Sequence, residues 1–211
     1  MKVEPLCRRD LAAAAAVVAD SHVTDPAMAW VYRDARSRGE TLAALFRLAL
    51  ADVLQAGHVD VVRVDDQIAG VAAWLPPGAF PVPWRRQLRS GPAFARVVAR
   101  APAATPRLMR FLSAATSAFP TEPRWQLNVV GVRPEWQGDG VGTVLLSHRV
   151  HAVSDRIHLE TWNPANLPFY GRFGFEVGAT DEPLGPDGPR RWTLAPPDPQ
   201  RRGAGQSASN R

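Results

Sequence analysis

The chain has 211 residues, of which 45% are hydrophobic and 21% charged, a composition typical of one globular domain with its own core. Its single cysteine, Cys7, excludes an internal disulfide and a zinc site built on cysteines, so we expect a reducing, cytoplasmic location and no bound metal. No apolar stretch reaches the ~20 residues of a membrane span. The net charge of +5 comes with arginines spread along the chain rather than gathered in one stripe, so we expect neither a membrane nor a nucleic acid as partner.

The N-terminal segment predicts a strand over 3–8 and a helix over 11–19. Asp10 stands directly before that helix and is a suitable N-cap. The dipeptide Asp25-Pro26 then breaks the helical pattern.

The next helix is the clearest periodic signal in the chain. Apolar side chains recur at helical spacing from Leu42 to Leu54, and Gly57 ends the pattern. Two apolar strands over 59–64 and 68–74 follow, separated by a short polar turn. This arrangement predicts a hairpin.

Beyond the hairpin, prolines are frequent between Pro76 and Pro123, around two helical patterns, and we interpret this segment as a helical insertion. An apolar strand over 125–132 leads into a glycine-rich loop and a helix, and another strand covers 157–162. The strand, helix and strand predict a parallel pair.

The C-terminal part predicts a short helix that Asn166 caps and Gly174 ends, and then two further strands. We expect one domain over 1–197, and a disordered tail over 198–211, which is rich in Gly, Ser and Gln.

The segment Gln137-Gly138-Asp139-Gly140-Val141-Gly142 is typical of a loop that binds a phosphate group. A Walker A loop is excluded, because Thr143 follows Gly142 without the lysine that such a loop needs. A dinucleotide-binding loop is a closer alternative, since Glu160 ends a strand where a ribose-binding acid is expected. Against it, Thr143 stands in place of the third glycine, and five residues separate Val132 from Gly138.

A third interpretation is a pyrophosphate loop of the form Arg/Gln-x-x-Gly-x-Gly/Ala, which Gln137, Gly140 and Gly142 match. With Val132 and Pro134 before it, the loop resembles the first motif of the GNAT acyl-CoA N-acetyltransferases. A second family motif follows about 20 residues later, carried by Leu159-Glu160-Thr161, Asn163, Asn166, Phe169-Tyr170 and Gly174-Phe175. The resemblance is strongest from Pro123 to Leu194. It is closest to the branch that contains puromycin N-acetyltransferase, because of Glu122-Pro123, Val130-Gly131-Val132, Leu159-Glu160-Thr161 and Asn166-Leu167-Pro168-Phe169-Tyr170.

The resemblance implies an α/β fold of the GNAT type, in which helices flank a mixed central sheet and two parallel strands splay apart. It also implies acetyl-CoA as co-substrate, bound in the gap between these strands. The residues that it implies for binding are Val130, Gly131, Val132, Gln137, Gly138, Asp139, Gly140, Val141, Gly142, Thr143, Asn166 and Tyr170.

For catalysis the resemblance implies that Tyr170 acts as general acid toward the thiolate of CoA. Glu160 is either a base, acting directly or through water, or a partner for backbone donors near the gap. Asp25, His22 and His58 are further candidates for the base.

For the acceptor, Trp74, Trp30 and Asp25 are candidate substrate-binding residues, and aromatic walls suit a flat or apolar amine. The expected activity is transfer of an acetyl group to a primary amine of a small molecule, with modification of an aminonucleoside antibiotic as one version. Two alternatives stay open, a dinucleotide-dependent oxidoreductase and a non-catalytic CoA-binding module. We expect a monomer or a homodimer.

Overall fold

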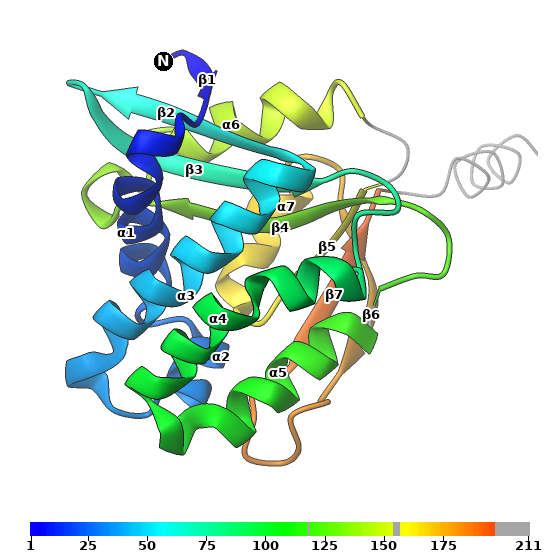
Figure 1. Ribbon diagram of the computed structural model, residues 1–211. Helices are drawn as coiled ribbons and strands as arrows, with labels where there is room; N and C mark the ends of the chain where they lie inside the picture. The colour runs from blue at the N-terminus through cyan, green and yellow to red at the C-terminus, as the bar shows by residue number, and fades with distance from the viewer. Residues whose placement is uncertain (118, 154–156, 197–211) are drawn as a thin grey trace, which may run out of the picture.

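A seven-stranded sheet forms the centre of the molecule (Figure 1). The computed structural model describes residues 1–117, 119–153 and 157–196, so the tail expected over 198–211 lies outside the described residues. The strands are β1 (Val3–Pro5), β2 (His58–Val64), β3 (Gln67–Leu75), β4 (Trp125–Val132), β5 (Ile157–Thr161), β6 (Glu176–Asp181) and β7 (Arg191–Ala195). Their order across the sheet is β1-β2-β3-β4-β5-β7-β6.

Helices cover both faces of this sheet (Figure 1). One face packs against α1 (Leu11–His22), α2 (Pro26–Val31), α3 (Ala35–Ala56), α4 (Trp84–Arg100) and α5 (Thr105–Ser117). The other face packs against α6 (Val141–Val150) and α7 (Leu167–Gly171). Single 3-10 turns, η1 (Arg8–Asp10), η2 (Pro102–Ala104), η3 (Pro134–Trp136) and η4 (Pro164–Asn166), precede α1, α5, the glycine loop and α7. The mixed α/β architecture predicted from the sequence is therefore confirmed.

The sheet is antiparallel except between β4 and β5. These two strands are parallel, as predicted, and α6 forms the crossover between them. They pair only at their starts, through Trp125 with Ile157 and Gln126 with His158. Along the rest of β4, the edge that faces β5 has no strand partner among the described residues. The two strands therefore splay apart in the middle of the sheet.

The predicted hairpin is present as β2 and β3, paired from His58 with Trp74 to Val64 with Gln67. Its turn places Asp65 and Asp66 at φ 48° and φ 61°. Aspartate is one of the few residues other than glycine that adopt this left-handed conformation readily. The composition of the turn therefore explains why the chain reverses there.

Two core clusters lie on opposite faces of the sheet, and β3 contributes to both. Val71 and Ala73 face the cluster of α1 and α3, whereas Ala72 and Trp74 face the cluster of α6 and α7. Nearly every residue of β3 is buried. Such two-sided burial is expected for a strand in the interior of a sheet that is covered by helices on both faces.

Some boundaries differ from those expected. β1 ends at Pro5 rather than at residue 8, and the helix expected from Leu42 begins at Ala35. Asp10 does not cap α1, because its carboxylate accepts a hydrogen bond from Arg63 at 2.7 Å. The Asp10 carboxylate is thus part of a long-range ion pair and makes no hydrogen bond to the N–H groups of the first turn of α1.

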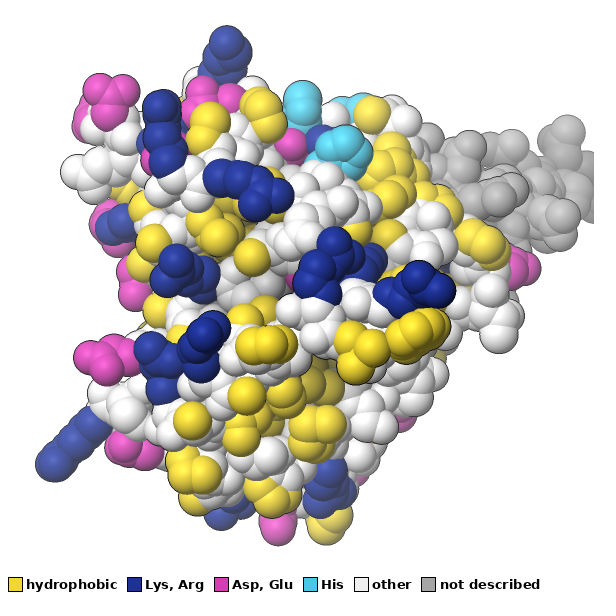
Figure 2. Space-filling model, viewed as in Figure 1, with side chains coloured by type: hydrophobic (Ala, Val, Ile, Leu, Met, Phe, Trp, Pro, Cys, Tyr) yellow, Lys and Arg dark blue, Asp and Glu magenta, His cyan; other side chains and the backbone are white. Residues whose placement is uncertain are grey.

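Basic side chains lie in separate groups on the face shown in Figure 2, among apolar and uncharged side chains. No helix in the described ranges is long and apolar enough to cross a membrane.

Candidate active site

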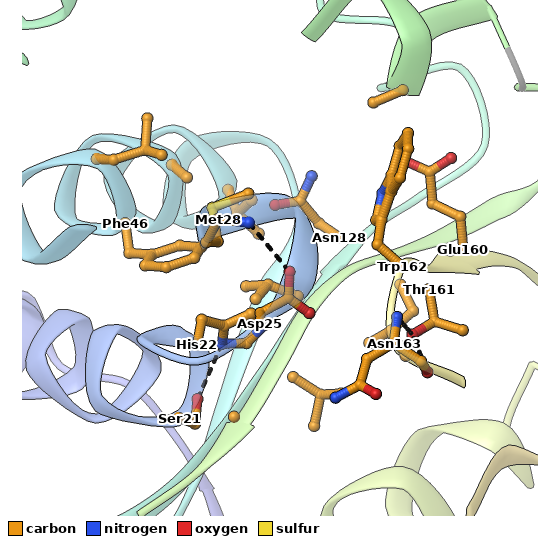
Figure 3. A pocket seen from close by; sticks show the side chains of 18 of the residues that line it. Ser21, His22, Asp25, Met28, Phe46, Asn128, Glu160, Thr161, Trp162 and Asn163 are labelled. Carbon is orange, nitrogen blue, oxygen red and sulfur yellow. Dashed lines mark hydrogen bonds between the residues drawn. The ribbon is translucent and has the colours of Figure 1, made fainter. Parts of the chain in front are cut away.

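A cavity of about 1490 Å³ opens where β4 and β5 separate. Its walls come from the turn between α1 and α2, from α3, α4 and α5, from β4, from the glycine loop, and from the segment that follows β5. Figure 3 shows Asp25 and His22 on one side of this space, Glu160 and Trp162 on the other, and Asn128 of β4 between them. Segments far apart in the sequence therefore meet around one cavity.

The glycine loop forms one end of the cavity, with Gly138, Gly140 and Gly142 in its wall. Gly138 and Gly140 have φ values of 94° and 83°, and a Cβ atom on either would meet no atom within 4 Å. Gly140 is the N-cap of α6, so the free N–H groups of the first helical turn start here. Gly142 packs closely under α7, since a Cβ there would lie 3.2 Å from the ring of Phe169, tighter than an ordinary contact.

Gln137 braces the loop: its side-chain amide donates a hydrogen bond to the carbonyl oxygen of Val132 at 2.9 Å. The sequence left open whether Gln137 braces the loop or reaches a phosphate, and the structure shows the brace. Val141 and Thr143 line the cavity with the glycines. Asp139 is exposed and is not part of the cavity wall.

Val130, Gly131 and Val132 lie on β4 where the strand has left β5, and all three line the cavity. Their opposite edge pairs with β3. A Cβ on Gly131 would lie 2.3 Å from the hydroxyl oxygen of Ser21, so α1 approaches β4 closely at this point. This contact places the end of α1 beside the open edge of β4.

Tyr170 lies on α7 and lines the cavity, although only 5% of its surface is exposed. Its ring packs edge-on against Phe169 at 5.3 Å and Phe175 at 6.4 Å, measured between ring centroids. Burial raises the pKa of the Tyr170 phenol, and the charge of Asp25 raises it further. The phenol therefore keeps its proton at neutral pH.

Glu160, near the end of β5, lines the cavity, and one of its carboxylate oxygens, Oε2, is buried and accepts no hydrogen bond from the described residues. The nearest cation is Arg191, whose Nη1 lies 3.6 Å from that oxygen. Arg191 makes its hydrogen bonds elsewhere, to both oxygens of Asp181 and to the carbonyl of Ala114. Burial raises the pKa of Glu160 to about 7, and Arg191 offsets only part of this effect. Such a carboxyl exchanges a proton near neutral pH.

Asn166 lines the cavity but does not cap α7 as expected. Its amide donates instead to the hydroxyl of Thr161 at 3.3 Å. The capping role belongs to Asn163, whose side-chain oxygen accepts from the N–H of Ala165 at 3.0 Å, at the start of η4. The two asparagines thus hold the segment after β5 against α7.

Two predicted substrate-binding residues lie outside the cavity wall. Trp74 is completely buried in the core cluster that α6 and α7 cover, and it is not among the residues that line the cavity. Trp30 packs at the edge of the other core cluster, where the guanidinium of Arg110 lies 5.8 Å from its ring. The base candidate His58 is also outside, stacked on Trp125 at 5.8 Å.

The aromatic side chains that do line this part of the cavity include Trp162 and Phe111, whose rings lie 5.5 Å apart. Sequence analysis missed both. For Trp162 a signal was present, because it directly follows Glu160-Thr161 at the end of β5. For Phe111 the helical periodicity showed only that it faces inward.

Within the described ranges, no group of three or more His, Cys, Asp or Glu side chains is placed to hold a metal ion. The cavity wall instead combines backbone donors, a protonated tyrosine and a carboxyl group that titrates near neutral pH. This set suits acid–base chemistry on a bound organic ligand.

Comparison with known proteins agrees with this geometry. Residues 107–177 match the family model described as acetyltransferase (GNAT) domain. A mycothiol acetyltransferase of Kytococcus sedentarius is 39% identical over 70 residues, which cover 30% of this chain and 24% of that protein. A mycothiol acetyltransferase of Thermobifida fusca is 35% identical over 66 residues, covering 28% and 20%. The similarity thus spans about a quarter or less of these relatives.

Among solved structures, a histone acetyltransferase HPA2 and related acetyltransferase from Corynebacterium glutamicum has a TM-score of 0.68 and 26% identity, covering 93% of this chain and 96% of that chain. An N-acetyltransferase from Staphylococcus aureus has a TM-score of 0.54 and 14% identity, covering 92% and 94%, and is similar in fold alone. The chain therefore has the GNAT fold, and residues 107–177 are similar to the GNAT acetyltransferase domain.

Proposed function

We propose that this protein is an N-acetyltransferase that moves the acetyl group of acetyl-CoA to a primary amine of a small molecule. The observation that carries the proposal is that the glycine loop, the unpaired edge of β4 and the buried Tyr170 all open into one cavity. A dinucleotide site would not need the gap between β4 and β5.

The residues present fit acetyl-CoA. The positive φ values of Gly138 and Gly140, with open space beside both, leave the loop N–H groups and the start of α6 free to bind a pyrophosphate. The backbone of Val130, Gly131 and Val132 suits the amides of the pantetheine arm, which would bind as an added strand does. Asp139, outside the cavity wall, would contribute only its backbone.

When bound, acetyl-CoA supplies the acetyl group as a thioester whose sulfur leaves as a thiol. Tyr170 holds the proton that the departing sulfur takes, because its raised pKa keeps the phenol protonated at neutral pH. Glu160 accepts a proton from the acceptor nitrogen, directly or through water. Its pKa of about 7 suits this role, because the carboxyl group is ionised in a substantial fraction of molecules at neutral pH and is still basic enough to take up a proton. No backbone group among the described residues donates a hydrogen bond to Oε2 of Glu160, so the role of a partner for backbone donors has no support at this oxygen.

The finer versions of the proposal rest on the sequence. The resemblance to the puromycin N-acetyltransferase branch makes an aminonucleoside antibiotic one candidate acceptor. The names of the relatives extend the range of candidates, because mycothiol acetyltransferases are among them. The cytoplasmic location and the state as monomer or homodimer stay predictions.

The experiment is to incubate the protein with acetyl-CoA and a panel of primary amines, and to measure the thiol released together with the mass of the N-acetylated amine. We expect release that depends on both the amine and the protein. Binding of acetyl-CoA without release for any amine would instead support a non-catalytic CoA-binding module. Binding of NADH or NADPH but not of acetyl-CoA would support the oxidoreductase alternative.

A further inference from the structure

The turn between α1 and α2 presents a carboxylate to the cavity, that of Asp25. One of its oxygens, Oδ1, caps α2 by accepting hydrogen bonds from the N–H groups of Ala27 at 2.9 Å and Met28 at 3.2 Å. Neither bond uses the second oxygen, Oδ2. The cap holds Asp25 in place and leaves Oδ2 available to a ligand.

His22, one turn before Asp25, presents a second acceptor. Its Nδ1 lies 2.9 Å from the carbonyl oxygen of Val18 and 2.9 Å from the hydroxyl oxygen of Ser21. The carbonyl can only accept, and the Ser21 hydroxyl donates its own hydrogen to Val18 at 2.9 Å, so Nδ1 carries the hydrogen. In the neutral ring Nε2 is then the nitrogen with a free lone pair. Burial lowers the pKa of His22, which keeps the ring neutral at pH 7. This side of the cavity therefore offers one negative and one neutral acceptor (Figure 3).

The other charged groups of the cavity wall give it a negative balance. Glu160 lies beside Trp162 on the other side of the cavity (Figure 3), and Asp20 lies near the α1–α2 turn. Asp52 is neutralised, because both of its oxygens accept hydrogen bonds from Arg86. Among the described residues, the Lys or Arg that lines the cavity is Arg172, which follows α7 and whose guanidinium lies 5.3 Å from the ring of Phe169.

The remaining wall, which α3, α4 and α5 form, is mainly apolar. Phe46, Phe94 and Phe111 line it, with Trp162 opposite Phe111. Aromatic rings of this kind bind flat apolar groups, and they attract a nearby ammonium by its contact with the ring face.

We propose that the acceptor is a primary amine with an apolar body that binds as an ammonium ion to Asp25 Oδ2 and His22 Nε2, and that amines bearing a carboxylate beside the nitrogen are excluded. This inference rests on the proposed acetyl transfer, whose acceptor it narrows. A carboxylate next to the ammonium would lie beside the carboxylates of Asp25 and Asp20, and among the described residues of the α1–α2 turn no Lys or Arg lines the cavity to balance it.

The test compares two ligands that differ only in a carboxylate, 2-phenylethylamine and phenylalanine. Their dissociation constants are measured by calorimetry at pH 7, with the protein alone and with the protein saturated with CoA. We expect 2-phenylethylamine to bind at least about tenfold more tightly than phenylalanine, because the carboxylate of phenylalanine would lie beside groups of like charge. Equal affinities, or no binding of 2-phenylethylamine, would overturn the proposal.

A variant tests the anchor itself. Asp25→Asn removes the charge and preserves the cap, since asparagine and aspartate are equally good at the N-cap position. Asp34→Asn is the matched control, because Asp34 caps α3 through the N–H of Arg36 at 3.1 Å and lies outside the cavity wall. We expect Asp25→Asn to weaken binding of 2-phenylethylamine about tenfold or more and Asp34→Asn to leave it unchanged.

Unfolding midpoints of both variants show whether each cap is retained. If Asp25→Asn keeps full amine affinity, the ammonium does not bind at Asp25 and the proposal is wrong. If the amine binds as expected but acetyl-CoA does not bind, the ammonium site stands and the proposed acetyl transfer fails.

Discussion

Tyr170 and Tyr32 are both buried tyrosines, and only Tyr170 lines the cavity. Tyr170→Phe removes the proposed acid and keeps the ring that packs against Phe169 and Phe175. We expect kcat to fall about 10²- to 10⁴-fold with little change in affinity for acetyl-CoA, because only the proton transfer is lost.

Tyr32→Phe is the control for this prediction, since the Tyr32 hydroxyl is buried and has no partner among the described residues. Turnover should be unaffected there, as measured by steady-state kinetics on both variants. Unchanged turnover in Tyr170→Phe would remove Tyr170 from its role as acid.

Glu160 connects stability and activity through one pKa. Burial raises this pKa from 4.5 to about 7, so the folded state favours the protonated carboxyl. Ionisation of Glu160 therefore lowers the free energy of unfolding. The loss is absent below about pH 4.5, where the carboxyl is protonated in both the folded and the unfolded state, and it reaches about 3 kcal/mol above about pH 7. Glu160→Gln, which carries no charge, should therefore gain stability relative to the wild type as pH rises from 5.5 to 8. Urea unfolding at the two pH values measures this difference.

Activity should respond to pH in the opposite sense, because the carboxylate is the form that accepts a proton. In the wild type, kcat/KM is expected to rise with pH through about pH 7. In Glu160→Gln this rise should disappear, and kcat/KM should fall by about 10²-fold or more. Glu182→Gln is the control, since Glu182 pairs with Arg190 on the exposed surface at 2.9 Å. A rise near pH 7 that persists in Glu160→Gln would assign the proton acceptor to another group.

Among the elements, those with a clear apolar period were predicted well from sequence. Leucine and alanine at helical spacing define α3, and β-branched residues on both sides of a polar turn define the hairpin of β2 and β3. The sequence pattern of β3 does not predict which of its side chains face which side of the sheet. Residues on both faces of this strand are buried, so apolar and polar residues do not alternate along it. The resemblance to the family, and not an alternation along β3, made Trp74 a candidate for the site, and it lies in the core instead.

The caps show a related limit. Asn163 and Asn166 are three residues apart, both stand near the start of a helical segment, and either suits an N-cap by composition. In the structure Asn163 caps η4, while Asn166 binds Thr161 at the end of β5. Asp10 is similar, since its ion pair with Arg63 joins residues 53 positions apart. Such choices depend on tertiary neighbours, which no local pattern records.

For the whole molecule, the candidate site was predictable where its residues are contiguous and not where distant segments meet. The glycine loop and the segment from Glu160 to Tyr170 carry their own motifs. His22 and Asp25 were candidates from the sequence, but it is the close approach of α1 to β4 at Gly131 that brings them to the cavity, and Phe111 joins them from α5. The acceptor half of the cavity is built mainly from such contributions. Its specificity is therefore a property of the assembled fold.

The stability of the whole fold reports whether acetyl-CoA binds at the loop. A ligand that binds only the folded state at 100 times its dissociation constant stabilises it by about 2.7 kcal/mol, which is about 5–10 °C in Tm for a domain of this size. We expect acetyl-CoA to produce such a shift in the wild type, and Gly140→Asp to abolish it, because a negative side chain would lie where the pyrophosphate binds. Gly78→Asp is the matched control. Gly78 has φ 81° and Gly140 has φ 83°, and both positions face open space, so aspartate strains the backbone to a similar extent at either position. Gly78 lies outside the cavity wall, and the Gly78→Asp variant should keep the full shift in Tm. An equal shift in both variants would mean that the glycine loop does not bind the pyrophosphate.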